Sequence, residues 1–118
     1  MRYTDIQRLR KILSTSEQLN DYLKENGISE DQVINSYSIQ WTVTTPLYNI
    51  GEQVYHISSE FKAAHPDIPW MRISGLRHRL VHDYEGTNWS IICQVLFEEL
   101  PGFVEQVKGI LANSPAAD

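Results

Sequence analysis

The feature of this sequence that most constrains its fold is the helical spacing of its apolar residues. These residues recur every three or four positions over long stretches, as in Ile6, Leu9 and Leu13, and no stretch alternates convincingly with a period of two. Such spacing gathers apolar side chains on one face of an α-helix, whereas a half-buried β-strand would alternate. We therefore predict an all-α fold, an antiparallel bundle of four or five helices joined by short loops.

Capping residues and a glycine predict where the first two helices begin and end. Thr4 or Asp5 can cap the first helix, and Gly27 fits the left-handed position that often follows a helix. The residues at 29–32, Ser-Glu-Asp-Gln, have the pattern of a capping box. A second helix is therefore expected to begin directly after Ser29.

The second helix is expected to be long. Helical spacing of apolar residues continues to residue 64, with Pro46 in the middle of the stretch. A proline inside a helix removes one backbone hydrogen bond and bends the helix. We predict one bent helix over residues 30–64, and the alternative is two helices separated near residues 44–46.

Two further helices are expected in the C-terminal half. Pro69 fits the first position of a helix that runs to Val81 or Asp83, because its missing N–H is tolerated there. Gly75, inside this helix, could allow a close approach to a neighbouring helix. Pro101 should kink the last helix.

Length and charge limit the classes of function. The chain has 118 residues and a formal net charge of −5. This length suits one domain over residues 1–118, with residues 113–118 as a flexible tail. An acidic protein does not coat nucleic acid by bulk charge, since such binding grows with the number of phosphates neutralised. Any contact with RNA must use a local positive patch, which two paired subunits could build together.

The cysteine content and the hydropathy indicate the compartment. The single cysteine, Cys93, lies in an apolar run and is expected to be buried rather than bonded to another cysteine. The chain starts without an apolar signal segment, and no apolar run reaches the length of a membrane span. We therefore expect a protein that has no contact with a membrane and lies in the reducing cytoplasm.

The segment most suited to chemistry lies at residues 77–84 and reads Arg-His-Arg-Leu-Val-His-Asp-Tyr. Arginine binds phosphate bidentately, and histidine can move a proton near neutral pH, so this set suits phosphodiester chemistry. On an ideal helix Arg77 and Tyr84 share a face, whereas Arg77 and His82 diverge by about 140°. Arg77 and His82 converge only if the helix loosens near His82, or if two subunits meet at the site.

The spacing Arg77-x4-His82-x-Tyr84 resembles the R-x4-H-x-Y signature of HepT-like ribonuclease toxins with the HEPN fold. The likeness extends over the Pro-Trp block and the helix at 66–84, over the Ile-Gly-Glu at 50–52 and over the Glu-Glu-Leu-Pro at 98–101 in the final helix. It covers roughly residues 45–111 well and the first helix only loosely. The resemblance implies an HEPN bundle, a dimer and an endoribonuclease that needs no metal or other cofactor. It implies that His82 acts as general base or acid while the ribose 2′-OH attacks the adjacent phosphate, and that Arg77 stabilises the phosphorane.

The resemblance also implies a partner and a modification. In related toxin–antitoxin pairs, an MntA-like nucleotidyltransferase antitoxin transfers AMP to the tyrosine that corresponds to Tyr84. The added bulk and negative charge would block RNA. The chain departs from the family pattern at His78 and Asp83, where an asparagine and a glycine are usual. These two residues and Arg79 are expected to support the site or bind RNA, and the RNA target, messenger or transfer RNA, is left open.

Plainer readings stand beside these hypotheses. Arg77 could serve only in a salt bridge, and Glu52, in an apolar stripe, could pair with Arg77 or Arg72 in the core. His78 and His82 have a spacing that can hold a metal, but a third ligand is lacking nearby in the sequence, so no metal site is expected. The rival function is a non-catalytic helical subunit that binds the substrate of a nucleotidyltransferase or presents it.

Aromatic residues in the expected second helix favour a homodimer. They are more numerous than one small core needs, and an unpaired apolar helix face is usually covered by a partner. The residues concerned are Tyr37, Trp41, Tyr48 and Tyr55.

Overall fold

The computed structural model describes residues 4–81 and 86–113, and every element in this part of the chain is helical. The prediction of an all-α fold is confirmed. In chain order the elements are α1 (Asp5–Glu25), α2 (Glu30–Asn35), α3 (Tyr37–Tyr55), α4 (Ser59–Ala64), α5 (Trp70–Val81), α6 (Trp89–Gln94), the π-helix η1 (Val95–Glu99) and α7 (Leu100–Ala112).

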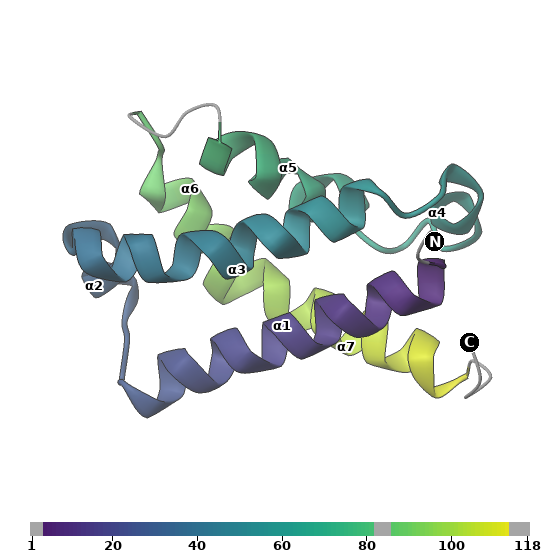
Figure 1. The fold of residues 1–118 in the computed structure, drawn as a ribbon, viewed down its shortest axis with the longest axis horizontal. Helices are drawn as coiled ribbons and strands as arrows, with labels where there is room; N and C mark the ends of the chain where they lie inside the picture. The colour runs from purple at the N-terminus through teal and green to yellow at the C-terminus, as the bar shows by residue number, and fades with distance from the viewer. Residues whose placement is uncertain (1–3, 82–85, 114–118) are drawn as a thin grey trace.

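The long helices form an antiparallel bundle with α3 at its centre (Figure 1). Helix α3 packs against α5 on one side and against α1 on the other, and α7 packs against α1. The short helices α2 and α6 lie together at one end of α3, and α4 lies near the opposite end. No helix among the described residues combines the length and the apolar character needed to cross a membrane.

The first two helices begin where their capping residues predict. The Thr4 hydroxyl accepts a hydrogen bond from the backbone N–H of Gln7, and the Gln7 side chain accepts one from the backbone N–H of Thr4. Ser29 and Gln32 make the same reciprocal pair at the start of α2. Gly27 follows α1 with a φ of 58°, the left-handed conformation that glycine adopts without strain.

The prediction of one long helix over residues 30–64 is wrong, and so is the alternative break near residues 44–46. The chain leaves the helical conformation at Ser36 and again after Tyr55, while Pro46 lies inside α3. Ser36 caps α3 and Ser58 caps α4 through their hydroxyls, each of which accepts a hydrogen bond from the backbone N–H three residues further on. Asp5 of α1 also accepts hydrogen bonds from the N–H and hydroxyl of Ser58, which fixes the second break.

The C-terminal helical stretch is irregular next to Pro101, where the sequence predicts a kink. Its irregular turn is the π-helix η1, and Pro101 lies in the first turn of α7, directly after η1. A proline is tolerated in a first turn because the N–H that it lacks would have no partner inside the helix. Helical residues nevertheless run without a gap from Trp89 to Ala112, so Pro101 lies inside one helical stretch, directly after its irregular turn.

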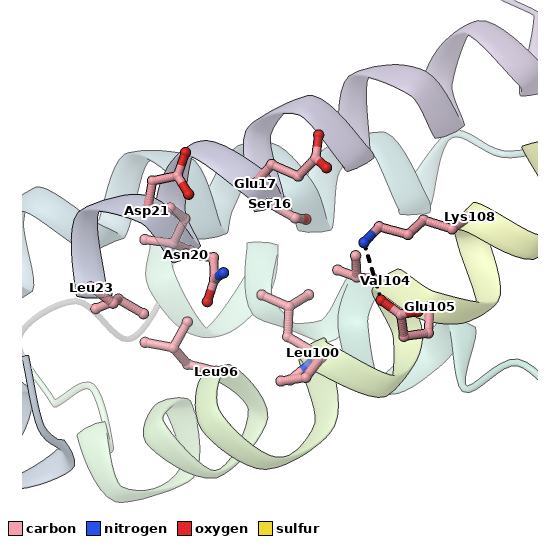
Figure 2. Close-up of a pocket in the computed structure, with 12 residues that line it drawn as sticks. Ser16, Glu17, Asn20, Asp21, Leu23, Leu96, Leu100, Val104, Glu105 and Lys108 are labelled. Carbon is pink, nitrogen blue, oxygen red and sulfur yellow. Dashed lines mark hydrogen bonds and ion pairs between the residues drawn. The ribbon is translucent and has the colours of Figure 1, made fainter. Parts of the chain in front are cut away.

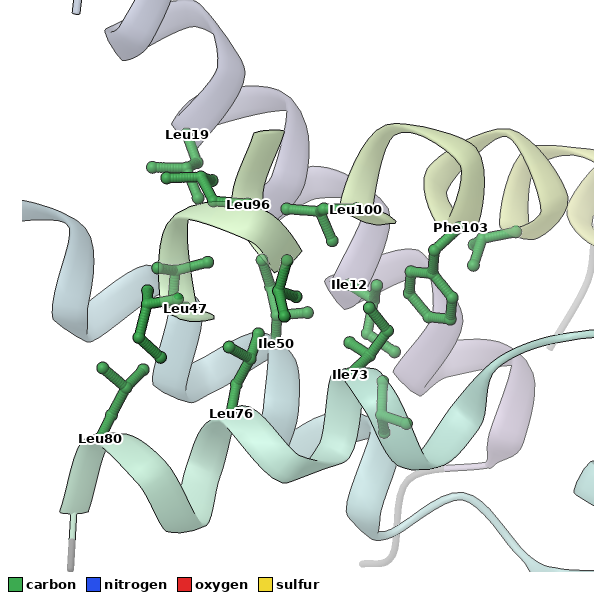
Figure 3. Close-up of a cluster of buried hydrophobic side chains, with 14 of the residues drawn as sticks. Ile12, Leu19, Leu47, Ile50, Ile73, Leu76, Leu80, Leu96, Leu100 and Phe103 are labelled. Carbon is green, nitrogen blue, oxygen red and sulfur yellow. The ribbon is translucent and has the colours of Figure 1, made fainter. Parts of the chain in front are cut away.

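The core lies where α1, α3, α5, η1 and α7 meet (Figure 3). From α5, Ile73, Leu76 and Leu80 point into it, and they face Leu47 and Ile50 of α3. Burying one such side chain contributes roughly 1.5–3 kcal/mol, so this row holds α5 against α3. Trp70 and Cys93 are buried as well, and the burial of Cys93 confirms its prediction.

The sequence suggested a close helix approach at Gly75. In the structure the close approach between α3 and α5 occurs at Gly51 instead. A Cβ atom added at Gly51 would lie 2.8 Å from the backbone nitrogen of Arg77 and 3.2 Å from the backbone oxygen of Ile73. A Cβ atom added at Gly75 would meet nothing within 4 Å. The helices therefore touch backbone to backbone at Gly51, one residue before Glu52 and directly beside Arg77.

Candidate functional site around Arg77

Helix α5 places Arg77 at the edge of its contact with α3. Ile73, Leu76 and Leu80 recur at helical spacing and fill the core, so Arg77, which follows Leu76, lies on the flank of this buried face. Its side chain is 33% exposed, so the guanidinium is partly covered but accessible from outside. An arginine in this position can reach both α3 and a ligand.

Glu52 of α3 binds the guanidinium at one edge. Arg77 Nε donates a hydrogen bond to Glu52 Oε1 at 2.5 Å, in an ion pair whose two side chains are each about one-third exposed. The contact at Gly51 brings the two helices close enough for this bond. Because the bond uses Nε, the two Nη atoms lie on the edge of the guanidinium that it leaves available.

Tyr55 covers one face of the same guanidinium. The central carbon of the Arg77 guanidinium lies 4.2 Å from the centroid of the Tyr55 ring, which is a cation–π contact. Tyr55 is 53% exposed, and it follows Glu52 by three residues, so both side chains project from one side of α3. We call Arg77, Glu52 and Tyr55 the arginine clamp.

The electrostatics of the clamp keep both partners charged. The hydrogen bond from Arg77 lowers the pKa of Glu52, burial opposes this shift, and the charges of Arg77 and His56 add to the lowering. His56 Nε2 lies 3.6 Å from Glu52 Oε2. The same hydrogen bond raises the pKa of Arg77, which donates it. At neutral pH the clamp is therefore a carboxylate and a guanidinium.

The other arginines of α5 are placed differently. Arg72 binds Glu99 of η1 through Nε and Nη2. The sequence left Arg77 and Arg72 as possible partners of Glu52, and in the structure Glu52 pairs with Arg77. Arg79 and His78 are exposed, and the backbone oxygen of Arg79 accepts a hydrogen bond from the Thr87 hydroxyl at 3.5 Å. Both residues thus lie on the outer surface beside Arg77.

Three of the site residues expected from the sequence, His82, Asp83 and Tyr84, lie outside the described residues, which resume at Gly86. Their convergence with Arg77 stays a prediction.

Sequence reasoning missed Tyr55 as a contact of Arg77. The available signal was its spacing of three residues from Glu52. Side chains three residues apart lie on the same side of a helix, so an arginine that pairs with Glu52 also lies near Tyr55. Within the described residues no group of His, Cys, Asp and Glu side chains could hold a metal ion.

One groove on the described part of the molecule lies elsewhere, between α1 and the segment η1–α7 (Figure 2). It measures about 490 Å³, and none of its lining residues comes from α3 or α5. Leu96, Leu100 and Val104 line its apolar part, and Lys108 and Glu105 form an ion pair at its edge. This groove is therefore separate from the clamp, whose side chains are partly exposed on the surface of α3 and α5.

A helical bundle that presents an oriented guanidinium on an open surface is a scaffold for binding a phosphate group of a large substrate. The comparisons with known proteins agree with this class. A family model described as Ribonuclease HepT-like matches residues 4–110. The chain belongs to the HepT-like ribonuclease family.

Individual relatives match over most of their length. The protein named "Putative RNase TTE0752" from Caldanaerobacter subterraneus subsp. tengcongensis is 35% identical over 103 residues, which cover 87% of this chain and 90% of the relative. "Probable ribonuclease HepT" from Thermococcus cleftensis is 28% identical over 93 residues, which cover 79% of this chain and 83% of the relative. No solved structure gives a significant match.

Proposed function

We propose that this protein is a metal-independent endoribonuclease and the toxin of a toxin–antitoxin pair. The observation that carries the proposal is the arginine clamp in a chain of the HepT-like ribonuclease family. The clamp leaves the Nη edge of Arg77 available, which is the geometry that a bidentate contact with a phosphate requires. His82, five residues further along the chain, supplies the second group that the reaction needs.

The proposed reaction is an internal transfer within the RNA chain. His82 takes the proton of a ribose 2′-OH as the 2′ oxygen attacks the adjacent phosphorus. Arg77 binds the non-bridging oxygens, on which negative charge develops in the phosphorane. The bond from phosphorus to the 5′ oxygen then breaks, and that oxygen takes up a proton. The products are a 2′,3′-cyclic phosphate and a 5′-OH, and the reaction requires no water or metal ion.

Cleavage of RNA by three variants tests this proposal. Arg77→Ala and His82→Ala should each lose activity by about 100-fold or more, in line with the loss of a charge-stabilising or proton-transferring group. Arg72→Ala is the matched control, because Arg72 lies on the same helix but binds Glu99. It should cleave RNA at the native rate. Mass spectrometry of the fragments should find cyclic phosphate ends. Native rates in Arg77→Ala or His82→Ala would disprove the proposal.

The proposed regulation is AMP transfer to Tyr84 by an MntA-like nucleotidyltransferase. The tyrosine oxygen would attack the α-phosphorus of ATP and release pyrophosphate. The new phosphodiester would place negative charge two residues from His82, where it would compete with an RNA phosphate. Co-expression with the partner enzyme should add AMP to the native chain and not to Tyr84→Phe. An unchanged intact mass of the native chain would refute this role.

We further propose a homodimer that pairs through α3. Tyr37, Trp41, Tyr48, Glu52 and Tyr55 lie within about 60° of one another around the helix axis and form one stripe, which we call the α3 stripe. Tyr37 and Trp41 are 68% and 71% exposed, and their rings pack edge to face at 4.9 Å. Glu52 is the single charged residue in α3. An aromatic surface poor in charge is typical of the centre of a protein interface.

The α3 stripe ends in the arginine clamp, since Glu52 and Tyr55 belong to both. A second chain seated on the stripe would therefore lie next to Arg77 and could bring its own site residues to the same opening. Pairing of this kind would also provide a positive surface for RNA on an acidic protein. Two copies of Arg77 and Arg79 would gather into one positive patch on a protein whose net charge is −5.

Toxicity on expression separates the nuclease from a helical subunit that only binds a nucleotidyltransferase or its substrate. A nuclease should arrest growth, and both Arg77→Ala and His82→Ala should relieve the arrest. Growth arrest that persists in both variants, at equal protein levels, would favour the binding subunit.

A further inference from the structure

We propose that Glu52 is the positioning residue for Arg77 and that it fixes the guanidinium so that its Nη edge faces the phosphate of the substrate. This inference rests on the proposed nuclease function, which makes Arg77 the group that contacts the reacting phosphate. Glu52 itself would touch neither RNA nor the reacting atoms. Its effect on the reaction would pass entirely through the orientation of Arg77.

The contacts of the clamp restrict the guanidinium in two independent directions. The hydrogen bond from Nε to Glu52 fixes its rotation within its own plane, since Nε must point at the carboxylate. The ring of Tyr55, 4.2 Å from the guanidinium carbon, fixes the tilt of that plane. Within the described residues, these two contacts leave the edge that carries the two Nη atoms for a ligand. An arginine held in this way forms a bidentate bond with less loss of side-chain freedom.

The backbone holds Glu52 as firmly as Glu52 holds Arg77. Gly51 lies against the backbone nitrogen of Arg77, so the anchor points of the two side chains are set by the contact between two helices and not by a loop. Ile50 and Leu76, the core neighbours of the pair, are both fully buried. A site built on packed helices keeps its geometry better than one built on loops.

A carboxylate beside a phosphate-binding arginine has a cost, and this cost makes the proposal specific. Glu52 carries a negative charge and so weakens the general attraction of the site for RNA. A residue whose only role was to bind RNA would not carry a negative charge. If Glu52 orients Arg77, its loss should reduce the rate of the chemical step, kcat, while KM stays the same or falls. A merely structural ion pair would instead lower the stability of the fold and leave kcat unchanged in the folded protein.

The chain offers a matched control for this distinction. Glu99 binds Arg72 of the same helix α5 in the same kind of ion pair, and both glutamates have a pKa lowered by their arginine. Removing either carboxylate costs α5 one ion pair. Only the removal of Glu52 frees Arg77. The variants Glu52→Ala and Glu99→Ala therefore differ in whether Arg77 is released, and Glu52→Ala also loses the contact with His56.

The first measurement is cleavage of an end-labelled single-stranded RNA by the full chain, at saturating and subsaturating RNA. Glu52→Ala should lower kcat by about 10- to 100-fold, the size expected when a reacting group is displaced by about an ångström. Glu52→Gln keeps an oxygen acceptor for Nε–H and should fall between Glu52→Ala and the native chain. Glu99→Ala should stay within about twofold of native, as surface changes usually do. Thermal unfolding confirms that each variant is folded, and Glu52→Gln replaces Glu52→Ala if the latter is not.

The second measurement does not depend on activity. The Nε–Hε signal of Arg77 in a ¹H–¹⁵N NMR spectrum reports the bond to Glu52 directly, and Arg77→Lys identifies it. In the native chain this proton should exchange slowly with water. Glu52→Ala should abolish that protection, and Glu99→Ala should preserve it.

The outcomes separate the two proposals. If Arg77→Ala cleaves RNA as fast as the native chain, the nuclease function proposed for Arg77 fails, and Glu52 has no catalytic group to position. If Arg77→Ala is inactive but Glu52→Ala has the native kcat, or leaves the Arg77 signal protected, only the role of Glu52 is overturned. Loss of kcat without a rise in KM, together with loss of protection in Glu52→Ala alone, supports the proposal.

Discussion

At the scale of single residues, the charge of Glu52 links the stability of the fold to pH. Arg77 lowers the pKa of this carboxyl from its ordinary value of 4.5 in the folded chain. A lowered folded pKa means that the stabilisation is present above pH 4.5 and is lost as the pH falls through the folded value. Glu52 therefore stabilises the protein at neutral pH and contributes nothing in strong acid.

The first prediction compares the native chain with Glu52→Gln by denaturant unfolding across this range. The native chain should have the higher free energy of unfolding at neutral pH, and the difference should shrink as the pH falls below 4.5. Glu99→Gln should behave in the same way, because Arg72 lowers the pKa of Glu99. A difference that grows in acid would contradict the assignment.

The second prediction concerns the thiol of Cys93. This side chain is fully buried, and burial raises its pKa to about 11. Only the thiolate reacts with disulfide reagents, so the thiol should be inert in the native chain at mildly alkaline pH. It should react at once in denaturant, which an absorbance assay with a chromogenic disulfide measures. Fast reaction of the native chain would mean that α6 opens readily.

Two residues of the clamp show what sequence could and could not provide. The motif identified Arg77, but it left Glu52 to pair with either of two arginines. Which arginine Glu52 meets depends on where α3 and α5 cross, and that is set by packing at Gly51, a contact between residues far apart in the chain. The likeness to HepT toxins supplied the roles of His82 and Tyr84, and these stay predictions because both lie outside the described residues.

At the scale of helices, local signals were predictable and breaks inside an apolar pattern were not. The starts of α1 and α2 follow from capping boxes, which need only four consecutive residues. The break at Ser36 was missed because helical spacing continues across it. The spacing counted Tyr37 and Trp41, which are exposed and belong to the α3 stripe, while the true core face of α3 is Val43, Leu47, Ile50 and Val54. Periodicity alone does not tell a buried stripe from an exposed aromatic one.

The third prediction tests the crossing of α3 and α5. In Gly51→Ala the new Cβ would meet the backbone of α5 at 2.8 Å, so one helix must move. We expect a loss of roughly 1–3 kcal/mol in the free energy of unfolding, the usual cost of overpacking. Gly75→Ala, inside α5 with open space around it, should instead gain about 0.5–1 kcal/mol from helix propensity. Thermal or denaturant unfolding measures both, and equal effects of the two substitutions would refute the close contact.

At the scale of the whole molecule, the α3 stripe differs in composition from the acidic remainder of the chain. The acidic residues that give the chain its charge of −5 lie largely outside α3, while the α3 stripe presents aromatic rings next to Arg77. A phosphate-rich substrate would be repelled by most of this surface, and Arg77 and Arg79 of one chain give it only a small positive area. Pairing through the stripe would enlarge that area and bury exposed rings at the same time. The exposed rings and the net charge are thus both consistent with the proposed dimer.

The fourth prediction tests this assembly. In Trp41→Glu a charge replaces the most exposed ring of the α3 stripe, without disturbing the core, since Trp41 is 71% exposed. If the stripe is the dimer interface, the dissociation constant from analytical ultracentrifugation should rise by at least about 30-fold, as for an aromatic hot spot. Met71→Glu is the control, because Met71 is 86% exposed on α5, outside the stripe, and should leave the dimer intact.

Activity of the Trp41→Glu monomer then decides how the site is built. Arg77 and His82 diverge by about 140° on an ideal helix, so they meet across a dimer or after the helix loosens. A monomeric Trp41→Glu that no longer cleaves RNA, although its clamp keeps the Arg77 Nε–Hε signal of the native chain, would show that the partner chain completes the site. A monomer that cleaves at the native rate would place both residues in one chain and require that the helix ends before His82. A native chain that is monomeric at all concentrations would exclude the dimer itself.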